Sequence, residues 1–247
     1  MEQDIQKAVD LIIDSKFAIV YTGAGISVES GIPPFRGENG LWSKYDPNIL
    51  ELNYFHANPD EAWKVIKEIF YDFFGDAKPN AAHYAIAELE KLNLIKAVVT
   101  QNIDNLHYDA GSNEVYEFHG NSRMLICTTC ETKLPASEVD LSKNPLCGSC
   151  GRVLKPDFIF FGEGIPEAAY SKSVEAAQKA DLVIIIGSTG EVYPAASIPP
   201  YAKETGARVI EVNPDKSLFT DSITDLFLKG TATEIMNKIL IGIKQKL

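Results

Sequence analysis

The sequence lacks an apolar run long enough to cross a membrane. Its apolar runs, such as "LVIII" at 182–186, fall far short of the roughly 18 residues that a membrane-spanning helix needs. The N-terminal stretch "MEQDIQKAVDLIIDS" is acidic, whereas a signal peptide combines positive charge with an apolar segment. We therefore expect neither an export signal nor an anchor, and we predict a cytoplasmic protein with no membrane partner.

Positive charge is also scarce. Lys and Arg number 23 against 34 Asp and Glu, which gives a net charge of −11. Sequence-independent binding of nucleic acid depends on basic residues that neutralise phosphates, so we predict no direct nucleic-acid partner and expect cationic partners to be attracted instead. With 247 residues and 45% hydrophobic content, the chain is long enough for one large domain or a domain that carries a smaller insert.

Cysteine is rare, and its positions are informative. The four cysteines form two close pairs, Cys127/Cys130 and Cys147/Cys150, with sixteen residues between the pairs. Thiols stay reduced in a protein that is not exported, so a metal site is favoured over disulfides or unrelated redox thiols. The spacing is that of a zinc ribbon, in which four thiolates close a structural Zn²⁺ site and stabilise a lobe of about 35 residues that is too small for a core of its own.

Helical and strand patterns alternate along most of the chain. Residues 5–13 have the apolar spacing of an amphipathic helix, and Asn80 is a suitable N-cap for a helix over 80–94. Further helices are predicted near 166–180, 195–205 and 231–246, and short apolar strands at 16–21, 95–100, 181–188 and 207–213. Buried strands separated by helices predict an α/β fold with a doubly wound, Rossmann-like parallel sheet.

Two stretches interrupt this alternation and suggest inserts. Residues 36–79 are rich in aromatics and prolines and are predicted to be partly helical around 59–74, and residues 121–156 hold all four cysteines. We predict that a helical, flap-like insert (36–79) and a zinc-ribbon insert (121–156) form a smaller lobe. The Rossmann-like domain would then comprise 1–35, 80–120 and 157–247.

A glycine-rich loop, "TGAGISVESGIPPFRG" at 22–37, follows the first predicted strand. Gly23 and Gly25 allow a tight turn and a close approach of the backbone to a pyrophosphate. The dinucleotide fingerprint requires a third glycine where this sequence has Val28, so a conventional dehydrogenase is not favoured and a purely structural turn remains an alternative.

Polar residues lie at the ends of three of the predicted strands and at the end of a further short strand in "YEFHG" (116–120). The carboxyl ends of parallel strands meet at one edge, where open α/β sheets bind their ligands. The sequence therefore predicts a crevice suited to ribose and phosphate, formed by Gln101, Asn102, Asp104, His119, Gly187, Ser188 and Asn213.

Several of these residues have a structural alternative. Asn102 and Asp104 are also suited to capping a helix that begins near Asn105, and a lone histidine such as His119 is often structural. The remaining histidines are interpreted as structural (His83 and His107) or as a surface residue (His56).

Taken together, the motifs resemble those of the sirtuins over residues 5–240. The matching elements, in the family's order, are "GAGIS…SGIPPFRG", "TQNID", "FHG", the two CxxC pairs, "FFGE" (160–163), "GS" (187–188) and "VN" (212–213). The resemblance implies an enzyme that removes acyl groups from protein lysines. It consumes NAD⁺ as a co-substrate and releases nicotinamide and O-acyl-ADP-ribose, and it carries one structural zinc.

The resemblance also implies roles for individual residues. Phe35 and Arg36 belong to a flap over the nicotinamide ribose, Asn102 and Asp104 orient the ribose and the carboxamide, and His119 is the general base on a ribose hydroxyl. The implied NAD contacts are Gly23, Ala24, Gly25, Ile26, Phe35, Arg36, Gln101, Asn102, Ile103, Asp104, Gly187, Ser188, Asn213 and Thr231. An acyl-lysine peptide is expected to add a strand between the lobes, contacting Phe160, Phe161, Gly162, Glu191, Val192 and Tyr193.

The sequence departs from the family pattern in three places. Pro34 stands where Asp or Thr is usual, and Gly190 and Glu191 replace residues expected to be apolar or amide. The segment 62–74 lacks the Tyr-x-x-Arg pair that binds acidic acyl groups, so a neutral acyl group is expected. Mono-ADP-ribosylation of a protein and a non-catalytic interaction module built on the zinc lobe remain alternative functions.

Overall fold

A six-stranded parallel sheet dominates the structure. The computed structural model describes residues 2–35 and 40–247, and its strands lie in the order β3-β2-β1-β7-β8-β9. Their bounds are Ala18–Thr22 (β1), Ile95–Thr100 (β2), Val115–Glu117 (β3), Leu182–Ile186 (β7), Arg208–Asn213 (β8) and Leu226–Lys229 (β9). Every neighbouring pair is parallel, which confirms the doubly wound α/β fold.

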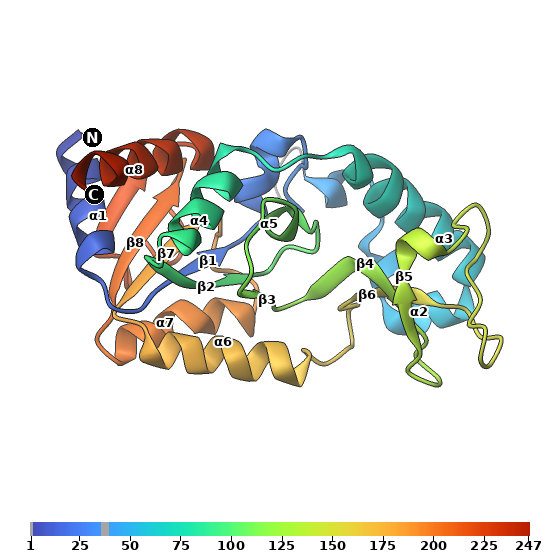
Figure 1. Ribbon diagram of the computed structural model, residues 1–247. Coiled ribbons are helices and arrows are strands. Elements are labelled where there is room, and N and C mark those ends of the chain that lie inside the picture. Colours follow the sequence, from blue (N-terminus) through green and yellow to red (C-terminus); the bar gives the residue numbers. More distant parts are fainter. Residues whose placement is uncertain (1, 36–39) are drawn as a thin grey trace.

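Helices cover both faces of this sheet (Figure 1). The helices on one face are α1 (Glu2–Asp14), α4 (Ala81–Lys91) and α8 (Ala232–Lys246), and those on the other are α6 (Glu167–Lys179) and α7 (Ile198–Glu204). Successive strand residues point to opposite faces. Val20 accordingly packs in the core with α1, α4 and α8, whereas Ile19 and Tyr21 pack in the core with α6 and α7.

No helix in the described ranges is both long enough and apolar enough to span a membrane.

The start of α4 is tied to the glycine loop by its cap. The Asn80 side chain accepts a hydrogen bond from the Ala82 amide at 2.9 Å, and His83 Nδ1 accepts one from the Asn80 amide at 3.3 Å. This reciprocal capping box confirms the predicted N-cap. Asn80 Nδ2 also donates to the Ile26 carbonyl at 2.7 Å. Ile26 lies in the 3₁₀ helix Ala24–Ser30 after β1, so the same side chain links the start of α4 to this helix.

A second, antiparallel sheet lies at the opposite end of the molecule from the chain termini (Figure 1). It consists of β4 (Gly120–Ile126), β5 (Lys133–Pro135) and β6 (Lys155–Phe158), in the order β5-β4-β6. With α2 (Leu52–Ala57), α3 (Pro59–Ile66) and a π-helical turn (Lys67–Phe73) it forms what we call the small lobe. Its core is aromatic and includes Phe55, Phe70, Phe158 and Phe160.

Two glycine turns, one after β1 and one after β7, pack backbone against backbone. The Gly25 amide donates to the Gly187 carbonyl at 2.9 Å, and Gly187 has a φ of +63°. A Cβ on Gly187 would lie 2.3 Å from the Ile26 nitrogen, and one on Gly25 would lie 2.6 Å from the Gly187 Cα. Only glycine fits at both positions, because any side chain would push the two turns apart.

This packing predicts that Gly187→Ala destabilises the fold more than Gly206→Ala. Gly206 also has positive φ, at +100°, but a Cβ there meets nothing within 4 Å. Both variants bear backbone strain of about 1–2 kcal/mol, whereas Gly187→Ala adds steric overlap of about 1–3 kcal/mol. At about 2–4 °C per kcal/mol for a chain of this size, thermal unfolding should give Gly187→Ala the lower Tm. Equal Tm values would contradict the packing account.

Candidate functional site

The residues that follow four strands of the large sheet are joined by hydrogen bonds at one edge. Gln101 Nε2 donates to Ser188 Oγ at 3.0 Å, which links the end of β2 to the end of β7. Asn102 Nδ2 donates to the Gly23 carbonyl after β1 at 3.2 Å. Asn213 Nδ2, at the end of β8, donates to the Ser188 carbonyl at 3.1 Å. The predicted convergence of strand ends is therefore present.

His119 lies at this edge, two residues beyond β3. Its Nδ1 is 3.0 Å from the Gln101 carbonyl oxygen, and because a carbonyl only accepts hydrogen bonds, Nδ1 must carry the ring proton of the neutral imidazole. Nε2 is then the ring nitrogen with a free lone pair. Burial lowers the pKa of His119, opposed by the hydrogen bond to Gln101, so the imidazole is neutral at pH 7 and able to accept a proton.

Half-buried Asp104 and buried Ser27 form a pair beside Asn102. Ser27 Oγ donates to Asp104 Oδ2 at 2.6 Å, and Asn102 Nδ2 donates to Ser27 Oγ at 3.3 Å. Burial raises the pKa of Asp104, although the hydrogen bonds from Ser27 and Leu106 act in the opposite direction. Ser27 is fully buried. Sequence reasoning missed it, and the only signal was its position inside the glycine motif.

The capping alternative applies to Asp104. The short helix α5 (Leu106–Asp109) begins two residues later, and Asp104 Oδ1 accepts a hydrogen bond from the Leu106 amide at 3.0 Å. Asp104 therefore caps α5 with one oxygen and holds Ser27 with the other. The Asn102 side chain binds Gly23 and Ser27, so its amide is directed toward the glycine loop.

The other histidines lie as expected. His107 is buried and its Nε2 is 2.9 Å from Thr22 Oγ1, while His83 is buried against it with ring centroids 4.9 Å apart. Burial lowers the pKa of His83 to about 4 and that of His107 well below its ordinary value. Both rings are therefore neutral at pH 7, and their structural role stays a prediction. His56 is exposed as predicted.

Glu211, a second residue that sequence reasoning missed, organises the edge next to β8. It is fully buried in β8, and it is distinguished in the sequence as an acidic residue inside the apolar run "VIEVN". Its carboxylate accepts hydrogen bonds of 2.6–3.0 Å from the side chains of Asn213, Ser217, Thr220 and Thr224. Four donors compensate the burial of this carboxylate and fix Asn213 together with the loop that follows it.

The remaining predicted NAD contacts lie on several elements. Ala24 and Ile26 belong to a 3₁₀ helix, Ala24–Ser30, which contacts α8, and Thr231 caps α8 by accepting from the Glu234 amide at 3.3 Å. Ile103 is buried between Asn102 and Asp104. The Phe35 ring packs 5.6 Å from the Trp42 ring. Arg36 lies outside the described residues, and NAD contact at all of these positions stays a prediction.

The predicted peptide contacts lie in two segments. Phe160 is buried against Phe55 and Phe158. The Phe161 amide donates to the Leu50 carbonyl at 2.7 Å and its carbonyl accepts from the Leu52 amide at 3.1 Å. The backbone of Phe161 is thus already paired. Peptide contact at Phe160, Phe161 and Gly162 stays a prediction.

The second peptide segment follows the turn at Gly187. Tyr193 is 70% exposed there, and Glu191 is also exposed whereas Val192 is half-buried. The unusual Gly190 has a φ of +79°, and a Cβ on it would lie 3.1 Å from the Phe219 ring. The departure at position 190 therefore has a backbone reason, because a larger residue would be strained and crowded.

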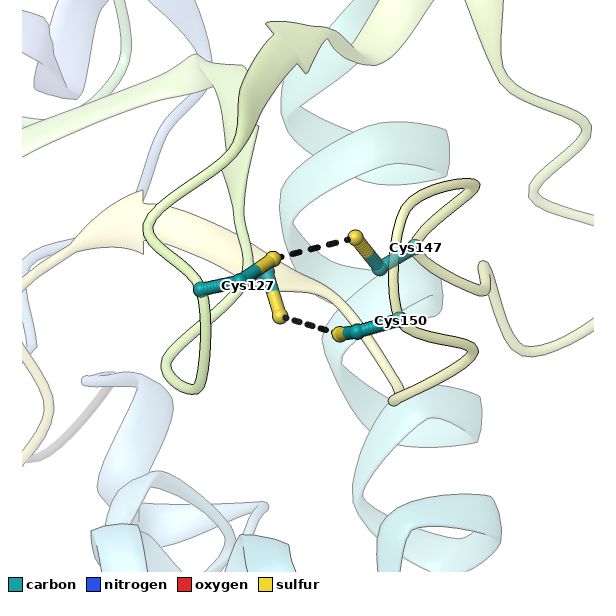
Figure 2. Close-up of side chains that lie close together, drawn as sticks. Cys127, Cys147 and Cys150 are labelled. Atoms are coloured by element: carbon teal, nitrogen blue, oxygen red, sulfur yellow. Dashed lines mark hydrogen bonds between the residues drawn. The ribbon is translucent and has the colours of Figure 1, made fainter.

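The four cysteines converge from two similar turns of the small lobe (Figure 2). The Cys127 carbonyl accepts from the Glu131 amide and the Cys147 carbonyl from the Gly151 amide, both at 2.8 Å. All four Sγ atoms lie within 4.8 Å of one another. Zn–S bonds of about 2.3 Å in a tetrahedron place the sulfurs about 3.8 Å apart, so the arrangement fits one Zn²⁺ as predicted.

The turns favour the thiolate at the first cysteine of each pair, whereas contacts with the neighbouring cysteines raise the pKa of Cys150 to about 12. Backbone N–H groups of Cys150 and Ser149 lower the pKa of Cys147 to about 6, and those of Cys130 and Thr129 lower the pKa of Cys127. Thiolate is the form that binds zinc. With four cysteine ligands the coordination shell is full, so the ion has a structural role.

We predict that the purified protein carries about one zinc per chain and that chelation loosens the small lobe while leaving the large sheet folded. Without the metal, the two cysteine turns lose the interaction that joins them. Hydrogen exchange should then increase across 121–156 and stay slow in β1 and β7. Unchanged exchange across 121–156 after the metal has been removed would contradict a structural role.

Comparison with known proteins gives a consistent result. A model of the Sir2 family matches residues 23–194. NAD-dependent protein deacylase 2 of Archaeoglobus fulgidus is 44% identical over 251 residues, covering 99% of this chain and 98% of the relative.

Two solved structures are similar over nearly the whole chain. One, from work on the mechanism and regulation of Sir2 enzymes, has a TM-score of 0.91 and 43% identity and covers 100% of both chains. The other is a Sir2 variant with a deacetylated p53 peptide and 3'-O-acetyl-ADP-ribose. It has a TM-score of 0.88 and 36% identity and covers 96% of this chain and 97% of that one.

Proposed function

The chain belongs to the Sir2 (sirtuin) family, and we propose on this basis that it deacylates protein lysines with His119 as the general base. It is an NAD-dependent protein deacylase. Its substrate is an acyl-lysine peptide or protein, and NAD⁺ is consumed as the co-substrate. The observation that carries the assignment of the base is the hydrogen bond from His119 Nδ1 to the Gln101 carbonyl at the edge where the strand ends meet.

The donors and acceptors at this edge suit the ribose and phosphate groups of NAD⁺. Side-chain amides (Gln101, Asn102, Asn213) and a hydroxyl (Ser188) are brought together by the hydrogen bonds described above. Such groups bind sugar hydroxyls and phosphate oxygens without adding a full charge. We propose that Asn102 and Asp104 orient the nicotinamide ribose, since their side chains are held in a single arrangement by Ser27 and Leu106.

His119 acts after the ribose has received the acyl oxygen. With its proton on Nδ1, the ring accepts a proton at Nε2 from a ribose hydroxyl, and that hydroxyl then attacks the acyl carbon. The Gln101 carbonyl holds the ring orientation and stabilises the charged imidazolium. Nicotinamide leaves as the acyl oxygen bonds to the ribose carbon. After the hydroxyl has attacked the acyl carbon, the lysine amine leaves and one water is taken up, so the products are free lysine, nicotinamide and O-acyl-ADP-ribose.

A neutral acyl group is the proposed substrate class. The segment 62–74, which spans α3 and the π-helical turn, contains no arginine to pair with an acidic acyl group. Its inner residues, including Ile66, Ile69 and Phe70, pack in the apolar core of the small lobe. The division of the chain into two domains and the cytoplasmic location stay predictions.

The proposed function predicts the products of a peptide assay. Incubated with NAD⁺, an acetyl-lysine peptide should lose its acetyl group and give O-acetyl-ADP-ribose by mass spectrometry, and a succinylated peptide of the same sequence should react more slowly. Without NAD⁺ neither peptide should change. ADP-ribosylated protein in place of free lysine would favour mono-ADP-ribosyl transfer, and failure to produce any of these would favour a non-catalytic module.

Substitution of His119 tests the base. We expect His119→Ala to lower the deacylation kcat by about 10²- to 10⁴-fold with an unchanged Tm, whereas His56→Ala, at an exposed histidine, should keep wild-type activity. The neutral ring is the active form and burial lowers its pKa below 6.5. The wild-type kcat/KM should therefore be constant near pH 7 and fall with acidification, with a midpoint below pH 6.5. A midpoint above pH 7 would contradict the assignment.

A further inference from the structure

Lys155, the first residue of β6, is buried, with 3% of its surface exposed. A buried ammonium group is costly unless acceptors surround it. Burial lowers the pKa of Lys155, and the charge of Glu163 opposes this shift. The mechanism described above gives this lysine no role, so its contacts require a separate explanation.

All contacts of the Lys155 ammonium fall on one short segment, 156–163. Its Nζ donates to the Pro156 and Phe158 carbonyls, both at 2.8 Å, and lies 3.1 Å from Glu163 Oε2. It also lies 4.4 Å from the centroid of the Phe160 ring. An ammonium has three protons, so these three oxygens satisfy it while the aromatic face contributes a cation–π contact.

Glu163 links the Lys155 ammonium to the backbone of the turn. Its Oε2, the oxygen nearest Lys155, accepts a hydrogen bond from the Phe160 amide at 2.6 Å, and the Glu163 amide donates to the Phe160 carbonyl at 3.0 Å. The turn that carries Phe161 and Gly162 is therefore closed by the pair Lys155–Glu163.

The same segment reaches the proposed base. The Ile159 amide donates to the His119 carbonyl at 2.9 Å, while Phe161 is paired with Leu50 and Leu52. The segment thus runs from the general base to the predicted peptide edge, and a shift in its turn would move both Phe160 and the positions open to a substrate strand.

We propose that Lys155 is a positioning residue: through Glu163 it holds segment 158–163 in the shape that receives the acyl-lysine. This inference rests on the proposed deacylase function. A buried ion pair is a weak source of net stability, and its better-supported use is to specify one arrangement. Here the specified arrangement is that of the substrate-binding turn.

The test measures KM and kcat for an acetyl-lysine peptide, with NAD⁺ affinity measured separately by calorimetry. We expect Lys155→Met and Glu163→Gln each to raise the peptide KM by about tenfold or more through misplacement of the turn, while the Kd for NAD⁺ stays within about twofold of wild type. Because both variants break one unit, the double variant should be no worse than the more affected single variant. Lys155→Arg should recover part of the loss.

Lys133→Met is the matched control. Lys133 lies on β5 of the same small sheet and pairs with Asp157 at 2.6 Å, but its side chain is 51% exposed, so its removal should leave the peptide KM unchanged. If Lys155→Met does not fold, Glu163→Gln and Lys155→Arg provide the same comparison.

A peptide KM within twofold of wild type in folded Glu163→Gln, or equal losses of peptide and NAD⁺ affinity in that variant, would overturn the inference. Wild-type protein in the same assay separates this result from failure of the proposed function. Absence of wild-type deacylation refutes the proposed function, whereas normal wild-type turnover with unaltered variants refutes only the role of Lys155.

Discussion

The contact between two glycine turns sets the geometry on which the site depends. The Gly25 amide bonds to the Gly187 carbonyl, with no space for a Cβ on either residue. This contact draws together the loops that follow β1 and β7, the two central strands of the sheet, at the edge formed by the carboxyl ends of the strands. The polar residues of the neighbouring strand ends can then bridge them, as Asn102 does to Gly23 and Asn213 does to Ser188. Without it, the two loops would lose the backbone contact that holds them at the distance these bridging hydrogen bonds require.

Around this contact the site is built from buried polar groups whose hydrogen bonds are largely made within the protein. Asp104 holds both Ser27 and the start of α5, and Glu211 gathers the hydroxyls of the loop after β8. Such groups are costly when unpaired, so each network strongly favours a single arrangement. The side chains that we propose to contact NAD⁺ are therefore positioned before any ligand binds, which reduces the ordering cost of binding.

Periodicity predicted β1, β2, β7 and β8, the inner strands of the large sheet, because strands buried on both faces give continuous apolar runs such as 182–186. The edge strand β9 was not predicted. The cysteine cluster and the convergence of the strand-end residues were also predictable. Both follow from local features of the chain, namely the CxxC turns and the positions at which the apolar strands end. β4, β5 and β6 were not predicted as strands, because their sequences alternate weakly and their pairing joins residues far apart in the chain. Ser27, Glu211 and Lys155 were missed because a buried polar residue is recognised only from its partners.

The position of His119 explains why the site lies between the two sheets. The chain leaves β3 of the parallel sheet at Glu117 and enters β4 of the small lobe at Gly120. His119 therefore lies in the connection between the two sheets. Its ring is hydrogen-bonded to the Gln101 carbonyl after β2, and its own carbonyl accepts a hydrogen bond from the Ile159 amide after β6. Gly120 has a φ of +75°, and a Cβ there would lie 2.2 Å from the Asp157 carbonyl oxygen. The close approach of β4 and β6 that this glycine permits brings the turn held by Lys155 and Glu163 beside the base. One short crossing thus connects the predicted dinucleotide edge and the predicted peptide edge through the same residue, His119.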